Sequence, residues 1–141
     1  MKKRGDEKLG EGYCAEVYGI WSKFSQINFD KLPSKFALKA NHGCKMNLLV
    51  MNKEGFMQHR LNYAKYITEK WRKINYFDFS LETQYKHIKK KLYAEKLRDL
   101  KEGCFSCDYQ IHCFSGEPVF AEIMPPVKSV PYNGSKGDTV L

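Results

Sequence analysis

A lysine at the end of an apolar stretch, followed by small and polar residues, is the first pattern that could do chemistry. The stretch FALK ends at Lys39 and is followed by ANHGCKMN. A bound phosphate needs positive charge and backbone N–H groups that approach it closely. Glycine permits this approach, and a lysine on a strand supplies a fixed charge. The segment does not match the P-loop pattern G-x-x-x-x-G-K-S/T. By spacing alone, two interpretations stay open: a phosphate-binding loop, or a hairpin turn with exposed polar residues.

Two carboxylates stand in otherwise apolar segments. Glu95 lies within YAEKL, and Asp108 begins DYQIHCF. A carboxylate that becomes buried needs a partner, such as a lysine, a metal ion or a ligand hydroxyl. The alternative for each acid is an outward-facing position at the edge of a sheet.

The cysteines do not form a recognisable framework. Their number, five, is odd, which argues against a set of disulfides. Cys104 and Cys107 together with His112 and Cys113 have the ligand types of a zinc site. His112 and Cys113 are adjacent in a predicted strand, however, so their side chains should point to opposite faces. We therefore predict no metal site from these residues.

The charge balance is basic. Lysine and arginine number 24 against 16 acidic residues, which gives a net charge of +8 and favours anionic partners. The segments KYITEKWRKINYFDF and YKHIKKKLY interleave basic and aromatic residues, as nucleic-acid-binding surfaces do. The solvated face of an amphipathic helix has the same composition. One hypothesis for the function is therefore a non-catalytic basic module that binds nucleic acid or another anionic polymer.

No stretch reaches the ~18 apolar residues of a membrane span. The N-terminal MKKRGDEKLGEG lacks the apolar segment of a signal peptide. We therefore expect a cytoplasmic protein without a membrane span.

Periodicity predicts a mixture of strands and helices. Phe56 to Ile74 has apolar residues at steps of three and four, an amphipathic helix. Ser80 is predicted to begin a second short helix that runs through YKHIKKK. The residues of 125–141 are rich in proline and glycine and predict a flexible tail. Neighbouring strands joined by short turns indicate an α+β fold with antiparallel sheets. The predicted strands are 15–21, 35–41, 46–52, 91–97, 108–114 and 118–124.

Taken in order, these segments resemble the TupA-like ATP-grasp family, which is associated with bacterial cell-surface polysaccharide and teichuronopeptide synthesis. Members typically read F-V-L-K-C-N-H-G-S-G where this chain has FALKANHGCK. They read Y-K-N-I-K-P-R-I-I-A-E-E-Y-L where it has YKHIKKKLYAEKL, and D-Y-K-F-F-C-F-N-G-K-P-K-F-I where it has DYQIHCFSGEPVFAEI. The resemblance runs over most of residues 9–123.

The resemblance implies that residues 1–124 form part of an ATP-grasp fold. It implies an enzyme that uses ATP and Mg²⁺ to join a carboxylate to an amine, although some relatives carry the label glycosyltransferase. The implied partners are a nucleotide and a small molecule or polysaccharide precursor, so nucleic acid is not the expected ligand.

Site residues follow from the resemblance by position. Lys39 would reach the ATP phosphates, and Glu95 and Lys96 would lie near the adenine and ribose. Asp108 and His112 would line the same cleft. The mobile loop over the phosphates would contain Asn41, His42, Gly43, Lys45 and Asn47.

The chain also departs from the family pattern. Lys45 stands where a second glycine is usual, and Gln110 replaces a lysine. After Ile123 the pattern is lost, and the later segment that would carry the Mg²⁺ ligands has no counterpart. We therefore expect a chain shortened at both ends relative to its family. It would be a shortened relative, a fragment, or a domain that a partner chain completes.

Overall fold

The computed structural model describes residues 7, 8, 10, 12–97 and 108–124. These residues fall into two compact units, one on either side of the undescribed segment 98–107. The first unit combines helices with an antiparallel sheet, and the second is an antiparallel hairpin. The predicted α+β fold class is therefore confirmed.

The first unit is built on a four-stranded antiparallel sheet. Its strands follow the order β1-β4-β2-β3, so β1 and β4, far apart in the sequence, are neighbours in space. Two short 3₁₀ turns, Phe24–Gln26 and Phe29–Lys31, connect β1 to β2. The strands are β1 (Val17–Trp21), β2 (Phe36–Ala40), β3 (Asn47–Val50) and β4 (Leu92–Glu95).

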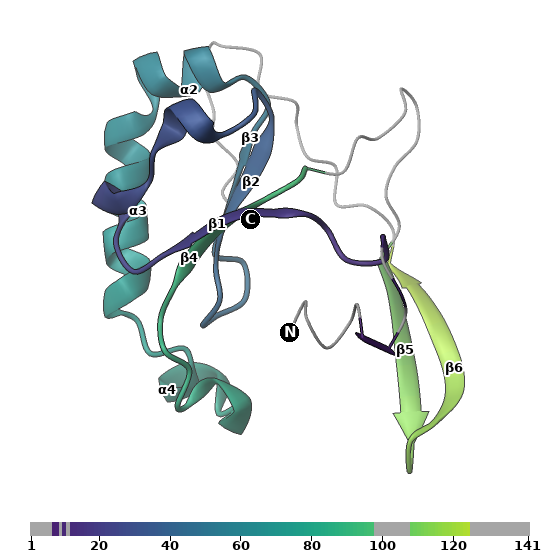
Figure 1. The fold of residues 1–141 in the computed structure, drawn as a ribbon. Coiled ribbons are helices and arrows are strands. Elements are labelled where there is room, and N and C mark those ends of the chain that lie inside the picture. The colour runs from purple at the N-terminus through teal and green to yellow at the C-terminus, as the bar shows by residue number, and fades with distance from the viewer. Residues whose placement is uncertain (1–6, 9, 11, 98–107, 125–141) are drawn as a thin grey trace. The chain divides into compact units, whose positions relative to one another are not determined.

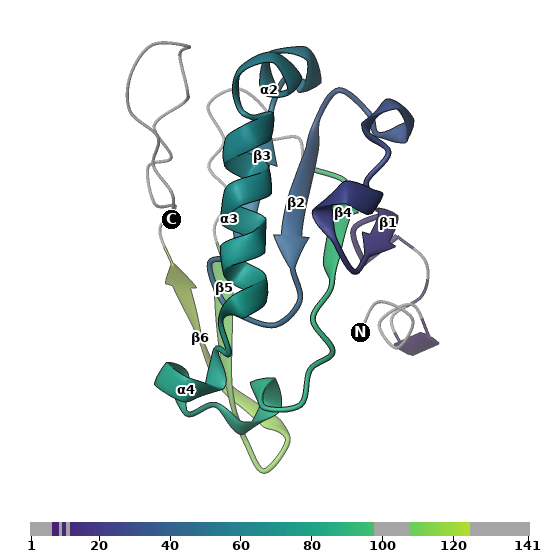
Figure 2. The same ribbon diagram turned by 90° about the vertical axis from the view of Figure 1, so that its left-hand side faces the viewer.

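Helices α2 (Lys53–His59) and α3 (Leu61–Lys73) cover one face of this sheet (Figures 1 and 2). Strand residues alternate between faces, and every second one points towards the helices. Phe36, Leu38 and Leu92 on this side have no exposed surface. The hydrophobic core of the first unit therefore lies between the sheet and α3.

The single helix predicted from Phe56 to Ile74 is wrong in its bounds. The structure has two helices that meet at Arg60, whose φ of −125° and ψ of −4° are not helical. The first helix begins earlier than predicted because the Asn52 side chain accepts hydrogen bonds from the N–H groups of Glu54 and Gly55. The chain changes direction between the two helices. Phe56 of α2 packs against the rings of Phe29 and Phe36, whereas α3 lies on the sheet.

The helix predicted through YKHIKKK is also wrong. Helix α4 (Phe77–Ser80) lies before it and ends at Leu81, whose φ is +55°. Only a 3₁₀ turn, Thr83–Tyr85, follows in the described segment before β4. Within this segment, the backbone groups of Lys89 and Lys91 hydrogen-bond to Asn41, the residue that follows β2, instead of to a helical turn. That partner is not visible in the local sequence.

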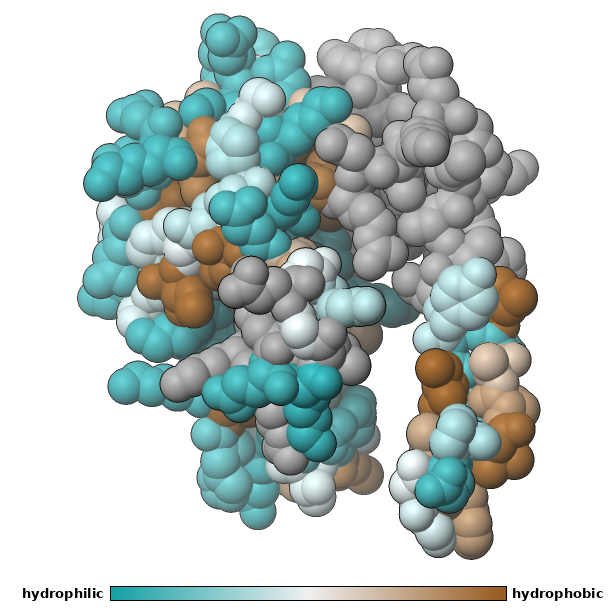
Figure 3. Space-filling view, turned by 45° about the vertical axis from the view of Figure 1, so that its right-hand side comes forward, coloured by the Kyte–Doolittle hydropathy of each residue, from teal (hydrophilic) through white to brown (hydrophobic). Residues whose placement is uncertain are grey.

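The second unit is the hairpin of β5 (Asp108–Phe114) and β6 (Glu117–Met124), as predicted. Ser115 and Gly116 connect the strands, and both have positive φ, 50° and 88°, which is the geometry of a type I′ turn. Figure 3 shows hydrophobic side chains on the surface of this hairpin, in line with exposed fractions of 66% for Tyr109 and 59% for Ile111.

Among the described residues, no helix has both the length and the apolar character that a membrane crossing requires.

Candidate functional site

The face of the sheet opposite α3, here called the open face, carries two rows of side chains. In the first row, Ile20 lies opposite Tyr93, Tyr93 opposite Lys39, and Lys39 opposite Asn47. Ile20 is 65% exposed, in contrast to the fully buried residues on the helix side. The second row consists of Val17, Glu95, Ala37 and Leu49.

An ion pair lies at the centre of the open face. Lys39 Nζ is 2.6 Å from Glu95 Oε1, and the two side chains are 34% and 19% exposed. Glu95 is two residues beyond Tyr93, the direct neighbour of Lys39, and long side chains can span this diagonal. The structure therefore brings together the two residues that the sequence assigned to the phosphate end and the nucleoside end of the site.

Tyr93 belongs to the same face but was not predicted as a site residue. Its ring is half-buried between the strand carrying Lys39 and the strand carrying Ile20. Burial raises the pKa of the Tyr93 phenol, and the nearby Glu95 carboxylate raises it further, while Lys39 opposes this. At neutral pH the phenol is therefore protonated and can donate a hydrogen bond.

A β-bulge brings two residues of β1 to the open face. The register shifts between Val17 and Gly19, so Val17 pairs with Glu95 and Ile20 with Tyr93 although they are three residues apart. Gly19 lies on the other face, where a Cβ atom would stand 2.3 Å from the Trp21 ring. The small residue is therefore required by the indole packed against it.

Asn41 joins the end of β2 to the basic segment before β4. Its backbone N–H donates to Lys91 O at 3.1 Å, and its side-chain amide donates to Lys89 O at 3.1 Å. The Lys91 N–H donates in return to Asn41 Oδ1 at 2.8 Å. Asn41 thus extends the pairing of the two central strands beyond Ala40 and fixes where the following loop begins.

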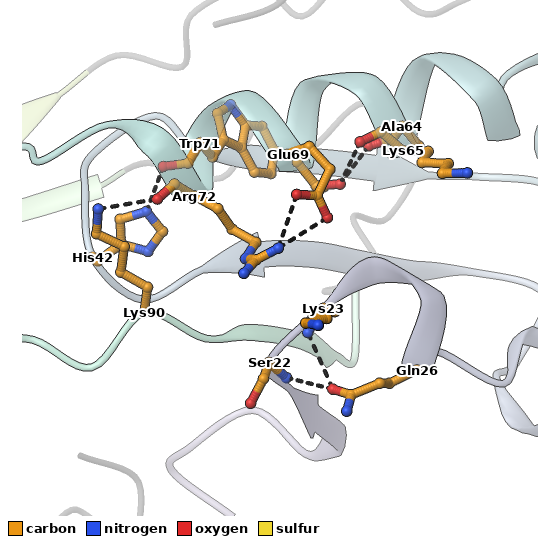
Figure 4. A network of polar contacts seen from close by, with 11 residues as sticks. Ser22, Lys23, Gln26, His42, Ala64, Lys65, Glu69, Trp71, Arg72 and Lys90 are labelled. Atoms are coloured by element: carbon orange, nitrogen blue, oxygen red, sulfur yellow. Dashed lines mark hydrogen bonds and ion pairs between the residues drawn. The ribbon is translucent and has the colours of Figure 1, made fainter.

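His42 is buried under the end of α3. Its Nε2 lies 2.8 Å from Trp71 O, and the side chain of Lys90 donates to the next carbonyl, Arg72 O, at 3.0 Å (Figure 4). The last carbonyls of a helix lack their usual partner four residues on, so these donors help to satisfy them, and Trp71 O also accepts from the Ile74 N–H at 3.1 Å. His42 Nδ1 has no hydrogen-bond partner. Burial lowers the pKa of His42, the hydrogen bond to Trp71 opposes this, and Lys90 adds to the lowering. His42 therefore anchors the loop to α3 as a neutral imidazole.

Two residues of the loop between β2 and β3 have constrained surroundings or backbone: Gly43 has no room for a Cβ atom, and Lys45 has a left-handed backbone conformation. A Cβ atom at Gly43 would lie 2.8 Å from Met46 Sδ and 3.1 Å from a ring carbon of Tyr76, so a larger residue would displace them. Lys45 has φ of +60°, a conformation that favours glycine. The backbone therefore explains why glycine is usual at this position in the family pattern that the chain resembles.

Replacing Lys45 by glycine should stabilise the protein. The left-handed conformation costs a residue with Cβ about 1–2 kcal/mol, and the greater flexibility of unfolded glycine offsets about 0.5–1 kcal/mol of the gain. We expect a rise of about 0.5–1 kcal/mol in the free energy of unfolding, measured by urea denaturation. Lys45→Ala removes the same charge but keeps Cβ, so it is the control. An equal gain in both variants would attribute the effect to charge instead of backbone conformation.

The remaining predicted residues are placed as follows. Asn47 begins β3 beside Lys39 on the open face. Lys96 follows Glu95, is exposed, and its backbone N–H donates to Glu16 O at 2.8 Å. Asp108 begins β5 in the second unit. In the same strand, His112 stacks on Phe120 with 4.3 Å between ring centroids, and its Nε2 is 3.6 Å from the Glu122 carboxylate. The convergence of Asp108 and His112 with Lys39 stays a prediction.

The described residues offer few ligands for Mg²⁺. Within them, no group of three histidine, cysteine or acidic side chains is placed to hold a metal ion. Mg²⁺ prefers oxygen ligands in octahedral geometry. The open face offers the Glu95 carboxylate, which Lys39 already engages, and the Asn47 amide. Cys104 and Cys107 lie outside the described residues.

Sequence reasoning missed Tyr93, Ile20 and the anchors of the loop. Tyr93 could have been found, because it is two residues before Glu95 in a strand and therefore shares its face. Ile20 could not, because its place depends on the pairing of β1 with β4 and on the bulge. The contact of His42 with Trp71 joins residues 29 apart and has no local signal.

Comparison with known proteins supports the family resemblance. The sequence model of one family, described as TupA-like ATPgrasp, matches residues 1–124, most of the chain of 141 residues. Searches of curated proteins and of solved structures found no match. The chain therefore belongs to the TupA-like ATP-grasp family.

Proposed function

We propose that this protein binds ATP on the open face of its first unit and serves ATP-dependent joining of a carboxylate to an amine in bacterial cell-surface polysaccharide synthesis. The observation that carries the proposal is the contact of Lys39 with Glu95 on adjacent central strands. The family assignment supports nucleotide chemistry. The resemblance of the sequence blocks supports the proposed role in polysaccharide synthesis.

The open face has different chemistry at its two ends. Ile20 and Tyr93 present an aliphatic and an aromatic surface on β1 and β4, which suits a nucleobase. Lys39 and Asn47 present a cation and an amide on β2 and β3, which suits a phosphate chain. A nucleotide that lies across the strands, with its base over β1 and β4, would meet a matching group at each end.

In this proposal the described residues act by positioning and by neutralising charge. Phosphoryl transfer depends on holding the reacting groups in line and on stabilising negative charge that develops on the transferred group. Lys39 is held by its strand and by Glu95, so its cation has a fixed place. Lys45, exposed in the adjoining loop, would add a second cation. ATP-grasp enzymes generally use Mg²⁺ to neutralise the phosphates as well.

Thermal unfolding with and without ATP tests the proposal. A ligand that binds the native state stabilises it by RT ln(1 + [L]/Kd), about 1.4 kcal/mol at ten times Kd. We expect the melting temperature of the wild type to rise with ATP concentration, both with Mg²⁺ and with EDTA. No shift at millimolar ATP in either buffer would contradict the nucleotide-binding proposal.

A basic binding surface is the second candidate function, and one observation favours it. On the outer face of α3, Lys70 Nζ lies 4.6 Å from the ring centroid of Tyr66, which is 56% exposed. The same helix also carries the negative charge of Glu69, which pairs with Arg72 at 2.8 Å, so α3 is not uniformly basic. A single-stranded oligonucleotide added in the same melting experiment separates the candidates. Stabilisation by the oligonucleotide but not by ATP would favour the basic surface.

A further inference from the structure

We propose that Lys91, positioned by the hydroxyl group of Ser22, is a second phosphate-binding residue of the open face, because it supplies a positive charge that no described carboxylate neutralises. This inference rests on the proposed nucleotide-binding function and adds a binding residue to the same face.

Lys91 lies on the open face, one position before β4. Leu92 points towards the helices and has no exposed surface, so its neighbour Lys91 points to the opposite face, as Tyr93 does. The extended pairing of the chain continues here. The Asn41 N–H donates to Lys91 O at 3.1 Å, and the Lys91 N–H donates to Asn41 Oδ1 at 2.8 Å. The alternation of the strand therefore applies to Lys91, although the residue lies just outside β4.

The side chain of Lys91 is held at the end of β1. Its Nζ donates to Ser22 Oγ at 2.5 Å. Ser22 follows Trp21, the last residue of β1, and its N–H donates to Gln26 Oε1 at 2.9 Å, so the first 3₁₀ turn fixes its place (Figure 4). An ammonium group has three donors, and a hydroxyl that accepts one hydrogen bond can still donate its own. The pair can therefore offer a phosphate both N–H and O–H donors from a fixed position.

The two lysines of the open face differ in the charge of their partners. Lys39 Nζ lies 2.6 Å from Glu95 Oε1, so this pair has no net charge. In the part of the chain that the structure describes, Lys91 forms no ion pair, and its side chain contacts a neutral hydroxyl. A phosphate that approaches the open face is therefore attracted by the full charge of Lys91, whereas Glu95 partly cancels the attraction of Lys39.

Tyr93 separates the two lysines. It lies directly opposite Lys39, and Lys91 is two residues before it, so the lysines are diagonal neighbours across β2 and β4. Residues in this relation are roughly 7–8 Å apart, within reach of long side chains. Lys39 is drawn towards Glu95 and Lys91 towards Ser22, at opposite ends of β4. A chain of linked phosphates can therefore contact both cations, and a single phosphate is less able to do so.

Calorimetric titration with ATP, AMP and adenosine in EDTA tests this inference. In Lys91→Met, ATP should bind about five- to tenfold more weakly than in the wild type, because a hydrogen bond to a charged group is lost. AMP should lose less, and adenosine, which has no phosphate, should bind as before. Lys91→Arg keeps the charge and should stay within about twofold of the wild type. Ser22→Ala should weaken ATP binding about two- to threefold, since Lys91 keeps its charge but loses its fixed place.

Lys65→Met is the matched control, because it removes the same charge from an exposed lysine of α3, the helix on the other face of the sheet. It should leave the ATP affinity within about twofold of the wild type. Melting temperatures without ligand show which variants are folded, and Lys91→Gln repeats the test if the methionine variant is not. An unchanged ATP affinity in a folded Lys91 variant without the charge, or an equal loss in Lys65→Met, overturns the inference.

A titration with inorganic tripolyphosphate separates this inference from the proposed function. Failure of the wild type to bind ATP overturns the proposed function. If the wild type then binds tripolyphosphate and Lys91→Met binds it at least about fivefold more weakly, the phosphate-binding role of Lys91 is still supported. Failure of the wild type to bind either ligand overturns both.

Discussion

Lys39→Ala should lower the affinity for ATP by about 10- to 100-fold, because a hydrogen bond to a charged group contributes about 1.5–3 kcal/mol. Lys39 is the cation on the open face that is held by a strand and by a carboxylate, so its place is set before the ligand arrives. Truncation also leaves Glu95 unpaired, and its negative charge then repels the phosphates. Calorimetric titration with ATP measures the change.

Two controls make the Lys39 result specific. Lys65→Ala removes an exposed lysine on α3 and should leave the ATP affinity within about twofold of the wild type. The melting temperature of Lys39→Ala without ligand shows whether the variant is folded. A folded Lys39→Ala protein that binds ATP as tightly as the wild type would contradict the assignment of the phosphate end of the site.

His42→Ala should have the largest effect on stability among the residues of the loop. The side chain is 2% exposed, and its removal leaves a cavity and takes from Trp71 O one of its two donors, the other being the Ile74 N–H at 3.1 Å. Loss of a buried side chain and of its hydrogen bond predicts a decrease of about 2–4 kcal/mol in the free energy of unfolding. Urea denaturation at pH 7.5 measures this decrease. His59→Ala, which truncates an exposed histidine of α2, should change stability by less than about 0.5 kcal/mol.

The pH dependence of stability tests the same residue independently. Burial lowers the pKa of His42 in the folded protein, so at mildly acidic pH the unfolded chain binds more protons than the folded one. Stability should therefore be highest above the ordinary histidine pKa of about 6.5 and should fall as the pH drops below it. The difference between wild type and His42→Ala should shrink over this range. A constant difference from pH 7.5 to 5 would show that His42 stays unperturbed.

Much of the secondary structure could be predicted because it depends on local patterns. Short runs rich in β-branched and aromatic residues predicted all six strands, and the short connections predicted the antiparallel pairing of β2 with β3 and of β5 with β6. The helices were less accurate. The break at Arg60 and the non-helical course of 86–91 follow from packing against the core and from hydrogen bonds to Asn41. The periodic pattern of a segment carries no information about partners that are distant in the sequence.

The placement of the candidate residues shows the same division between local and distant information. The order of the sequence blocks pointed to Lys39 and Glu95, and the structure places them in contact. The same blocks assigned His42 to the loop over the phosphates; His42 lies in the loop between β2 and β3, and its buried side chain anchors that loop to α3. A motif identifies residues that belong to a loop, but not which of them face a ligand and which hold the loop in place.

By itself, the sequence determined the family, the strands, and the residue types available for binding an anion, because each depends on neighbours in the chain or on the order of its blocks. Tertiary structure alone decided that β1 lies beside β4, that a bulge turns Val17 and Ile20 to the open face, and that Lys39 contacts Glu95. These are contacts between residues tens of positions apart. They form only when the burial of the core on one face of the sheet sets the register of the strands, and with it the side chains on the other face.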